Sequence, residues 1–405
     1  MMNNDISALS LSRLVMDMQE SATLKMAKLA RELKAKGKDV IDLSLGEPDF
    51  DTPVHIKEAA KKALDEGYTK YTPVNGLQEL REAIVRKFAR DNGLQYTPNQ
   101  IVVSNGAKQS VYNLCLALLD PGDEVIIPAP YWVSYYEIIK MAGGVPVVAY
   151  SNIENDFKCS AEQIEALISD RTKFILYSSP CNPSGSVFSY DELKAIATML
   201  QSYEHVLVVS DEIYEHINFT DRHHTIASFE GMQDRTIIIN GMSKAYAMTG
   251  WRLGYTASPA WVAEACTKIQ GQVTSGATSF GQKASVTALD ADHQPTKDMT
   301  KAFHQRRDLV IRLLEQIPLL LVNRPQGAFY MFPDVSAYFG KTTKDGNVVK
   351  DADDMSLYLL AEAMVSTVSG AAFGNDRCIR LSYATSEAKL TEAASRIEKA
   401  LSELH

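Results

Sequence analysis

The sequence has few cysteines, no long apolar run and no excess of positive charge, and each of these absences excludes a class of protein. The five cysteines are odd in number and form no CxxC pair, so reduced thiols are favoured over a disulfide framework or a zinc site. No stretch reaches the ~18 uninterrupted apolar residues of a membrane helix. With a formal net charge of −9, the protein lacks the basic surface that nucleic acid requires.

Several short motifs are also missing. No GxGxxG turn with a downstream acidic residue occurs, which argues against a nicotinamide-dependent dehydrogenase, and the lack of a GxxxxGK[ST] segment excludes a P-loop nucleotide enzyme. The pair His223–His224 has no spaced carboxylates near it in the sequence, so we expect no metal. Residues 1–13 are polar and lack the apolar segment of a secretory signal. We therefore expect a soluble, cytoplasmic protein whose partners are small molecules rather than membranes or nucleic acid.

Apolar, β-branched runs alternate with amphipathic helical patterns, such as 111–119 and 191–201, through the middle of the chain. This alternation predicts an α/β fold with a mainly parallel, seven-stranded sheet covered on both faces. The predicted strands are 101–104, 124–128, 145–150, 174–178, 206–210, 236–240 and 253–257. Ligands of such sheets bind beyond the carboxyl ends of the strands, so the residues that follow each strand are the candidates for a site.

The two ends of the chain have a different pattern, typical of an α+β domain. We predict long helices over 14–36 and 296–317, short strands over 329–332 and 378–383, helices over 355–364 and 386–404, and a mobile surface loop over 341–354. Residues 1–45 and 296–405 would then form a small domain from both chain ends, and residues 46–295 a large domain.

Two of the segments that follow strands are suited to binding an anion and a polar ring. In 104–109 the chain turns through Gly106 into a helix, where backbone N–H groups and the helix dipole favour a phosphate, although a tight turn alone has the same pattern. In 178–185 two prolines flank Asn182 and hold its amide in a rigid loop. The alternative is an asparagine that stabilises its own turn.

Two further segments carry a carboxylate and an amine. Asp211 ends a very apolar run, where a carboxylate is costly without a cation or a hydrogen-bond donor, unless it caps the next helix. Lys244 follows the next strand among small and apolar residues, which would lower its pKa towards nucleophilic use, although most lysines lie on the surface. Arg252 comes eight residues later and could return to the same pocket.

In this order the segments supply what pyridoxal 5'-phosphate (PLP) requires. Its phosphate needs N–H donors, a hydroxyl and an arginine, and its pyridine nitrogen needs a carboxylate that keeps it protonated. Its ring oxygen needs donors such as Asn182 and Tyr214, and its aldehyde carbon needs a lysine amine that later acts as acid and base.

Over residues 21–401 the chain resembles the class I aminotransferases, the aspartate aminotransferase family of PLP-dependent transferase fold type I. The resemblance is strongest to the bacterial aspartate/prephenate branch. It rests on the ordered motifs LSLGEPDFDTP, KYTPVNG, SNGAKQ, PYWVSY, SSPCNPSG, SDEIYEH, SKAYAMTGWRLGY and IRLSYATS.

The resemblance implies the roles of the residues around the cofactor. Lys244 would be the Schiff-base lysine and proton carrier, and Asp211 the partner of the pyridine nitrogen. Asn182 and Tyr214 would bond the ring oxygen, and Trp132 would stack on the ring. The phosphate ligands would be Ala107, Lys108, Ser243 and Arg252, joined by Tyr71 of a neighbouring subunit, which implies a homodimer with shared sites.

The resemblance also implies the substrates, which are an amino acid and a 2-oxo acid used in ping-pong order. Arg380 would clamp the α-carboxylate as a bidentate fork, helped by the backbone at Gly46 and by the neighbouring Trp132 and Asn182. No arginine occurs in 272–279, where some relatives bind the distal carboxylate from the partner subunit. Lys108 would take that role here, which favours aspartate and glutamate.

Prephenate or aromatic substrates stay open. Gln19 and Thr72 match positions linked to prephenate use, whereas Asn152 stands where plant prephenate enzymes have a lysine, and Ser369 stands where relatives have proline. A PLP-dependent β-lyase or decarboxylase would use the same cofactor residues. A PLP-sensing regulator would need a DNA-binding module, for which the N-terminus has no room.

Overall fold

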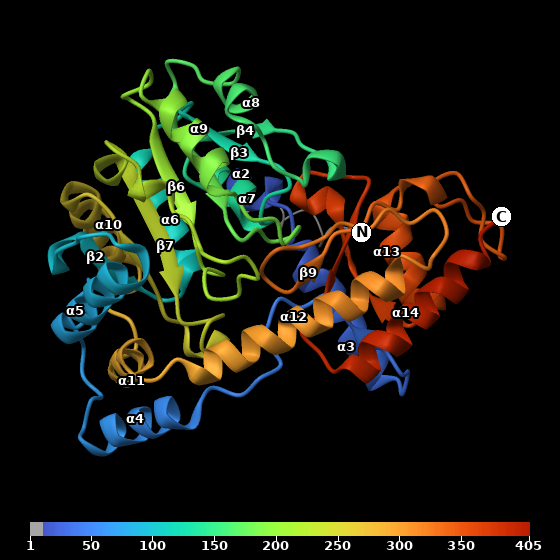
Figure 1. Ribbon diagram of the computed structural model, residues 1–405, viewed down its shortest axis with the longest axis horizontal. Coiled ribbons are helices and arrows are strands. Elements are labelled where there is room, and N and C mark those ends of the chain that lie inside the picture. The colour runs from blue at the N-terminus through green and yellow to red at the C-terminus, as the bar shows by residue number, and fades with distance from the viewer. Residues whose placement is uncertain (1–10) are drawn as a thin grey trace.

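Seven strands form the central sheet of the computed structural model, which describes residues 11–405 (Figure 1). Their order is β2-β8-β7-β6-β5-β3-β4. The strands are β2 (Ile101–Ser104), β3 (Glu124–Pro128), β4 (Val145–Ala149), β5 (Thr172–Ser178), β6 (Leu207–Asp211), β7 (Thr236–Gly241) and β8 (Gly254–Ala257). Only β8 is antiparallel to its neighbours in this sheet. The predicted strands all exist, with ends within two residues of those expected.

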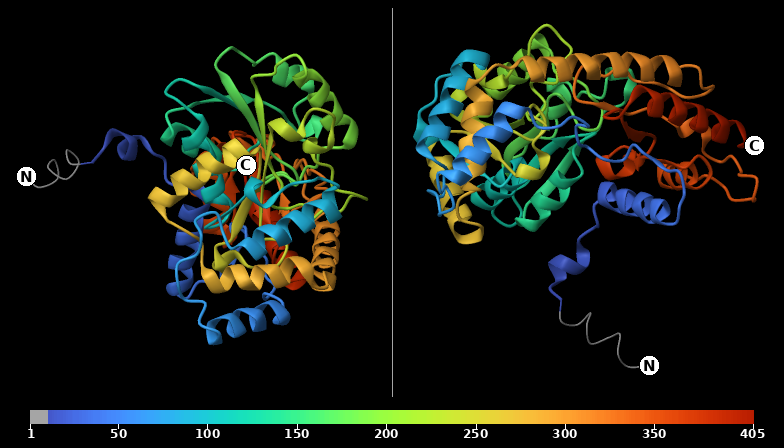
Figure 2. Two further views of the ribbon diagram at one scale, coloured as in Figure 1. Left: turned by 90° about the vertical axis from the view of Figure 1, so that its left-hand side faces the viewer. Right: turned by 90° about the horizontal axis from the view of Figure 1, so that it is seen from below.

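Helices cover both faces of the sheet, as the views in Figure 2 show. Because side chains alternate along a strand, Val125 and Ile127 of β3 pack on one face with α6, α7 and α10, while Ile126 packs on the other with α9. The helices around the sheet are α4 (Val54–Asp65), α5 (Gln78–Lys87), α6 (Ala107–Leu118), α7 (Ser134–Met141), α8 (Ala161–Glu165), α9 (Tyr190–Leu200), α10 (Ala260–Val273) and α11 (Ser279–Asp290).

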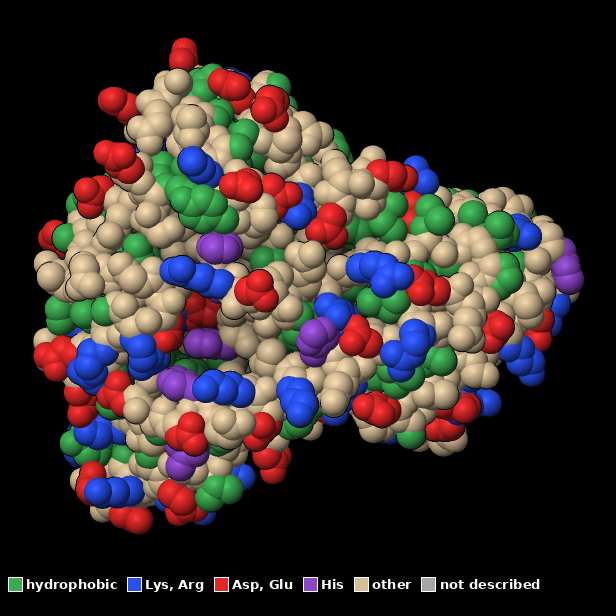
Figure 3. Space-filling model, viewed as in Figure 1, with side chains coloured by type: hydrophobic (Ala, Val, Ile, Leu, Met, Phe, Trp, Pro, Cys, Tyr) green, Lys and Arg blue, Asp and Glu red, His purple; other side chains and the backbone are tan. Residues whose placement is uncertain are grey.

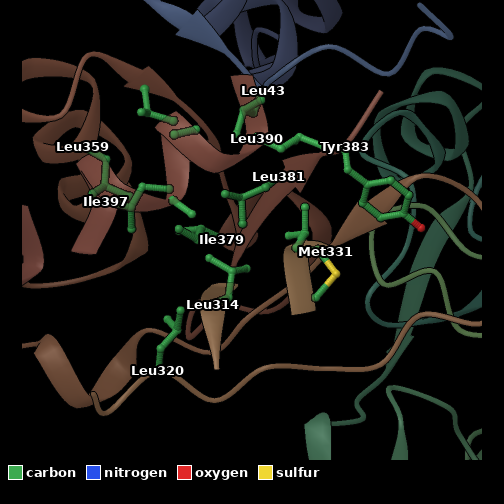
Figure 4. Packing of buried hydrophobic residues seen from close by; sticks show 14 of the residues in the cluster. Leu43, Leu314, Leu320, Met331, Leu359, Ile379, Leu381, Tyr383, Leu390 and Ile397 are labelled. Carbon is green, nitrogen blue, oxygen red and sulfur yellow. The ribbon is translucent and has the colours of Figure 1, made fainter. Parts of the chain in front are cut away.

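The two chain ends meet in a second, smaller unit. Strand β1 (Ile41–Asp42) pairs in parallel with β10 (Val365–Ser366), and β9 (Tyr330–Met331), β11 (Val368–Ser369) and β12 (Ile379–Ser382) form an antiparallel sheet. The helices of this unit are α3 (Ala22–Ala35), α12 (Gln294–Leu314), α13 (Ala352–Glu362) and α14 (Glu387–Ser402). Figure 4 shows Leu43 near Leu381 and Leu390, so residues from both ends share one core.

The limits 1–45, 46–295 and 296–405 stay a prediction for the domains. Residues 1–10 lie outside the described residues. The predicted start of the small domain and the expected absence of a secretory signal both depend partly on them. Within residues 11–405, no helix is both long and apolar enough to cross a bilayer.

One predicted helix was wrong. The expected helix over 14–36 is divided into α2 (Arg13–Asp17) and α3, and Met18 between them has an extended backbone. Ser12 caps α2 through its side chain, and Ser21 takes the N-cap position of α3. The helical period continues across residues 18–21, but these residues line cavities of the folded protein instead of continuing the helix.

The predicted loop over 341–354 ends earlier than expected. Helix α13 begins at Ala352 because the Asp351 side chain accepts a hydrogen bond from the backbone N–H of Asp354 at 2.9 Å. The mobility of residues 341–351 stays a prediction.

Candidate active site

A cavity of about 380 Å³ lies beyond the carboxyl ends of β5, β6 and β7, where they meet the unit built from both chain ends. Every predicted site residue except Tyr71 lines this cavity. These residues are Gly46, Ala107, Lys108, Trp132, Asn182, Asp211, Tyr214, Ser243, Lys244, Arg252 and Arg380. The Tyr71 side chain instead lies on the surface, 97% exposed. These residues therefore meet in one cavity beyond the strand ends, where the strand-end rule predicted them, and their roles in binding and catalysis stay predictions.

Lys244 lies in the turn that follows β7 and places an amine in the cavity. Its Nζ donates a hydrogen bond to the carbonyl oxygen of Gly46 and lies 5.7 Å from the ring centre of Tyr214 and 5.8 Å from that of Phe329. Burial lowers the pKa of Lys244 to about 8, with the charges of Arg380 and Arg252 acting in the same direction. This lower pKa increases the fraction of the amine that is neutral and nucleophilic near neutral pH.

Asp211 ends β6 and is 5% exposed. The hydroxyl of Tyr135 donates to its Oδ2 at 2.6 Å, and the backbone N–H of Ile213 donates to its Oδ1 at 3.2 Å. Burial raises the pKa of Asp211 to about 6 although both hydrogen bonds oppose this change. A cationic group placed in the cavity beside this carboxylate would stabilise its charged form.

Arg380 is 1% exposed, and its guanidinium contacts the loop that carries Asn182. Its Nη1 donates to Asn182 Oδ1 at 2.9 Å and its Nη2 donates to the Ser44 carbonyl. Its Nε has no hydrogen-bond partner among residues 11–405. The guanidinium lies over the ring of Tyr330 at 4.7 Å and over that of Phe373 at 5.0 Å. A buried cation in this state is suited to a carboxylate ligand.

The turn between β2 and α6 forms an anion cradle together with Arg252. Gly106 has φ 85°, and a Cβ at this position would collide with the guanidinium of Arg252. A Cβ at Gly254 would collide with the backbone of Ala107. These two glycines therefore allow an arginine and the N-terminus of a helix to approach each other, which favours phosphate binding.

Lys108, in the first turn of α6, points along the cavity wall. Its Nζ lies 4.9 Å from the ring centre of Trp132. Burial lowers the pKa of Lys108, and the charge of Arg252 lowers it further. Trp132 in turn packs edge-on against Tyr135, with ring centres 5.4 Å apart.

Two tyrosines of the site were not predicted. Tyr135 lies in the first turn of α7, three residues after Trp132, and this closeness in sequence was a signal that could have placed it beside the site. Tyr330 comes from β9, and its hydroxyl lies 2.7 Å from that of Tyr214. No sequence pattern linked Tyr330 to the cavity, because the contact joins residues from different domains of the prediction.

The arrangement resembles that of known enzymes in both sequence and structure. The family described as Aminotransferase class I and II matches residues 38–397. The aspartate/prephenate aminotransferase of Cereibacter sphaeroides is 47% identical over 380 residues, covering 93% of this chain and 95% of that protein.

Two solved structures have the same fold. The aspartate aminotransferase from Rhizobium meliloti superposes with a TM-score of 0.94 at 43% identity, covering 98% of this chain and 100% of that one. The aspartate aminotransferase from Thermus thermophilus with maleate has a TM-score of 0.91 at 40% identity, covering 96% and 99%. The predicted α/β fold of type I is confirmed.

Proposed function

This chain belongs to the class I and II aminotransferases and is an enzyme of that kind. From this premise we propose that it moves amino groups between aspartate or glutamate and a 2-oxo acid such as 2-oxoglutarate, with PLP as cofactor. The observation that carries the proposal is the convergence of a lysine amine, a buried carboxylate, a helix N-terminus and a buried guanidinium on one cavity. Because one cavity serves both half-reactions, the kinetics should be ping-pong.

The donor set of the cavity fits PLP. The N-terminus of α6 with Ser243 and Arg252 would hold the phosphate, and Asp211 would pair with the ring nitrogen and keep it protonated. Asn182 and Tyr214 would bond the ring oxygen, and Trp132 would cover the ring. When bound, the cofactor supplies an electron sink for the charge that develops at the substrate α-carbon.

The protein's own groups then orient the substrate and move its proton. Arg380 would hold the α-carboxylate, with Asn182 fixing the guanidinium through the 2.9 Å hydrogen bond. The Nζ of Lys244, whose burial lowers its pKa to about 8, would accept the α-proton. Positioned proton transfer of this kind contributes about 10²–10⁴-fold to the rate.

The cofactor proposal is tested by spectroscopy and labelling. The purified protein with PLP should absorb in the visible region, and borohydride should attach the cofactor to Lys244 permanently. A Lys244→Ala variant should show neither the label nor turnover. A colourless wild-type protein without a labelled peptide would contradict the proposal.

Lys108 carries the preference for dicarboxylates in this proposal, since its amine lies on the cavity wall beside Trp132. The Thermus thermophilus aspartate aminotransferase structure is that of the enzyme with maleate, a dicarboxylate. A Lys108→Ala variant should lose rate with aspartate and glutamate about tenfold more than with tyrosine. The matched control is Lys140→Ala, because Lys140 also lies over an aromatic ring, that of Tyr136 at 5.7 Å, but is not among the residues of this cavity.

Half-reaction rates provide the measurement. Equal losses for all substrates in Lys108→Ala would instead assign the residue to the phosphate or to folding. A loss of the same size in Lys140→Ala would show that the effect is not specific to the cavity.

Prephenate is the second candidate substrate because the Cereibacter sphaeroides relative, at 47% identity, is an aspartate/prephenate aminotransferase. Comparison of aspartate with arogenate, the product expected from prephenate, decides between the two. A rate with arogenate comparable to that with aspartate favours the bifunctional activity. Release of ammonia and an oxo acid from β-substituted substrates would favour a β-lyase.

We also propose a cytoplasmic homodimer in which Tyr71 completes the partner's site, since this large aromatic side chain is 97% exposed in one chain. Mixing Lys244→Ala with Tyr71→Ala subunits tests this. A heterodimer would contain one site with both lesions and one intact site, so activity should return on mixing. No recovery in mixed dimers would place Tyr71 outside the partner's site.

A further inference from the structure

A second cavity, of about 780 Å³, lies outside the active site between the start of α12 and the loop that follows β6. Figure 3 shows histidine, lysine and arginine side chains gathered around a hollow on this face, near the first turns of α12 in Figure 1. The proposed reaction uses none of its lining residues. Its basic residues are Arg90, His216, Arg222, His223, His293, Lys297, Lys301 and His304.

The two carboxylates that line this cavity, Asp91 and Glu215, are each paired with a cation. Asp91 forms an ion pair with Arg90 at 2.7 Å. Glu215 pairs with the fully buried Lys87 and also accepts a hydrogen bond from Asn240 at 2.9 Å. Although burial opposes it, Lys87 holds the pKa of Glu215 well below its ordinary value. The ammonium of Lys87 therefore cancels the charge that would otherwise favour a cation here.

A metal ion is disfavoured for the same reason. The ligand atoms of Glu212, Glu215 and His223 lie within 4.8 Å of one another, so the fold supplies the carboxylates that the sequence around His223 lacked. However, Thr225 donates to Glu212 at 2.6 Å, and His223 lies 3.0 Å from Glu212. Glu212 is therefore already engaged by Thr225 and His223, and the absence of a metal stays a prediction.

Three cations of the cavity, by contrast, have no ion-pair partner within residues 11–405. Among residues 11–405, the ion pairs of the lining residues involve Arg90, His216, His223 and His304, and none includes Arg222, Lys297 or Lys301. The two lysines project from successive turns of α12, and Arg222 projects from the loop that faces them. Three positive charges from two sides of one cavity are therefore free to meet a negative group.

Several buried side-chain nitrogens are also without hydrogen-bond partners. Within the described chain, both ring nitrogens of His293, Nδ1 of His223 and Nδ2 of Asn218 are shielded from solvent and have no hydrogen-bond partner. The His223 side chain is 10% exposed. Buried polar atoms without partners are rare in folded proteins. Because lysine, arginine and amide N–H groups only donate, the ligand that satisfies them must accept hydrogen bonds.

We propose that this cavity is a second ligand site that binds a small polyvalent anion bearing phosphate or carboxylate groups. The anion lies between Lys297 and Lys301 on α12 and Arg222 on the opposing loop, with His293 and Asn218 as neutral donors. The inference stands independently of the substrates proposed above.

The position of the cavity gives the bound anion a mechanical consequence. Thr300 Oγ1 donates to the carbonyl of His216 at 2.7 Å, and Thr296 Oγ1 donates to the carbonyl of Ala245 at 2.8 Å. Helix α12 is thus attached to the loops that follow β6 and β7, next to Lys244. An anion that bridges α12 and the 216–223 loop reinforces this attachment and raises the melting temperature of the holoenzyme.

Calorimetric titration of the holoenzyme tests the site, at constant ionic strength, with inorganic pyrophosphate in one arm and citrate in the other. At least one of the two should bind saturably, and the arm that binds more tightly distinguishes phosphate from carboxylate as the ligand group. The Lys297→Ala/Lys301→Ala double variant should weaken that binding about tenfold, since two partly exposed charge contacts are lost. Arg222→Ala, on the other wall, should weaken it as well.

Two control variants make the result specific. Lys389→Ala/Lys399→Ala removes two exposed lysines of α14, far from the cavity in sequence, and should leave the affinity unchanged. Lys108→Ala removes a cation of the active site and should also leave it unchanged. Absence of saturable binding in both arms, full affinity in both cavity variants, or loss of binding in Lys108→Ala would overturn the proposal.

Discussion

Replacing Asp211 by asparagine should stabilise the cofactor-free protein while impairing the holoenzyme. Burial raises the pKa of Asp211 from 3.8 to about 6. A difference of about two units corresponds to about 3 kcal/mol at 1.36 kcal/mol per unit. Because the folded carboxyl group binds its proton more tightly than the unfolded one, stability falls as the pH rises from 3.8 through about 6. Above this window the penalty is complete, and Asp211→Asn removes it.

Urea unfolding of the cofactor-free protein measures this effect at a fixed protomer concentration, since a dimer's stability depends on concentration. At about pH 7.5 the variant should be more stable by about 3 kcal/mol, and at about pH 5 by roughly half of that. With cofactor added, the same variant should bind PLP more weakly and turn over slowly, because the ring nitrogen loses its anionic partner.

The control is Asp353→Asn, which changes an exposed carboxylate of α13 and should alter stability by no more than about 0.5 kcal/mol. A variant Asp211→Asn that is no more stable than the wild type at about pH 7.5 would refute the reasoning. An advantage of equal size at both pH values would show that titration of this carboxyl group is not its cause.

Three other predictions concern the same cavity. Arg380→Lys keeps the charge but loses the planar fork, so kcat/KM in steady-state assays should fall about 100-fold for every amino acid. A loss confined to dicarboxylates would contradict the binding of the α-carboxylate by Arg380. Tyr135→Phe removes a donor to the buried carboxylate, so a fluorescence titration should show PLP binding about tenfold more weakly; unchanged affinity would separate this hydroxyl from the cofactor. Gly106→Ala should weaken PLP binding more than Gly122→Ala. Both glycines have positive φ, but only a Cβ at position 106 would collide with a neighbour. Equal effects of the two substitutions would mean that backbone strain alone matters.

Much of the fold was predictable because its signals are local. The apolar, β-branched runs that became β2 to β8 are short and, apart from β4, mostly buried, and several of their ends carry the polar residues of the candidate site. Asp211 and Lys244 were found in this way, each directly after a strand. The resemblance to the aminotransferases then connected Arg380, which no local pattern distinguished from any other arginine on a strand.

Other features depended on contacts between distant parts of the chain. The break between α2 and α3 was missed because the helical period continues through residues 18–21, whereas the folded chain has an extended backbone at Met18 and starts a new helix after Ser21. Likewise, the carboxylates near His223 are separated from it in the sequence and come close only after folding.

The sequence by itself therefore determined which residue types follow which strands, because hydrophobic periodicity and turn chemistry act over a few neighbouring residues. The tertiary structure decided the chemical state of those residues. It placed Arg380 against Asn182 across 198 positions of the chain, and it surrounded Lys244 and Asp211 with apolar atoms that move both pKa values towards neutrality. Burial and long-range pairing depend on the packing of the whole chain, so no local pattern encodes them.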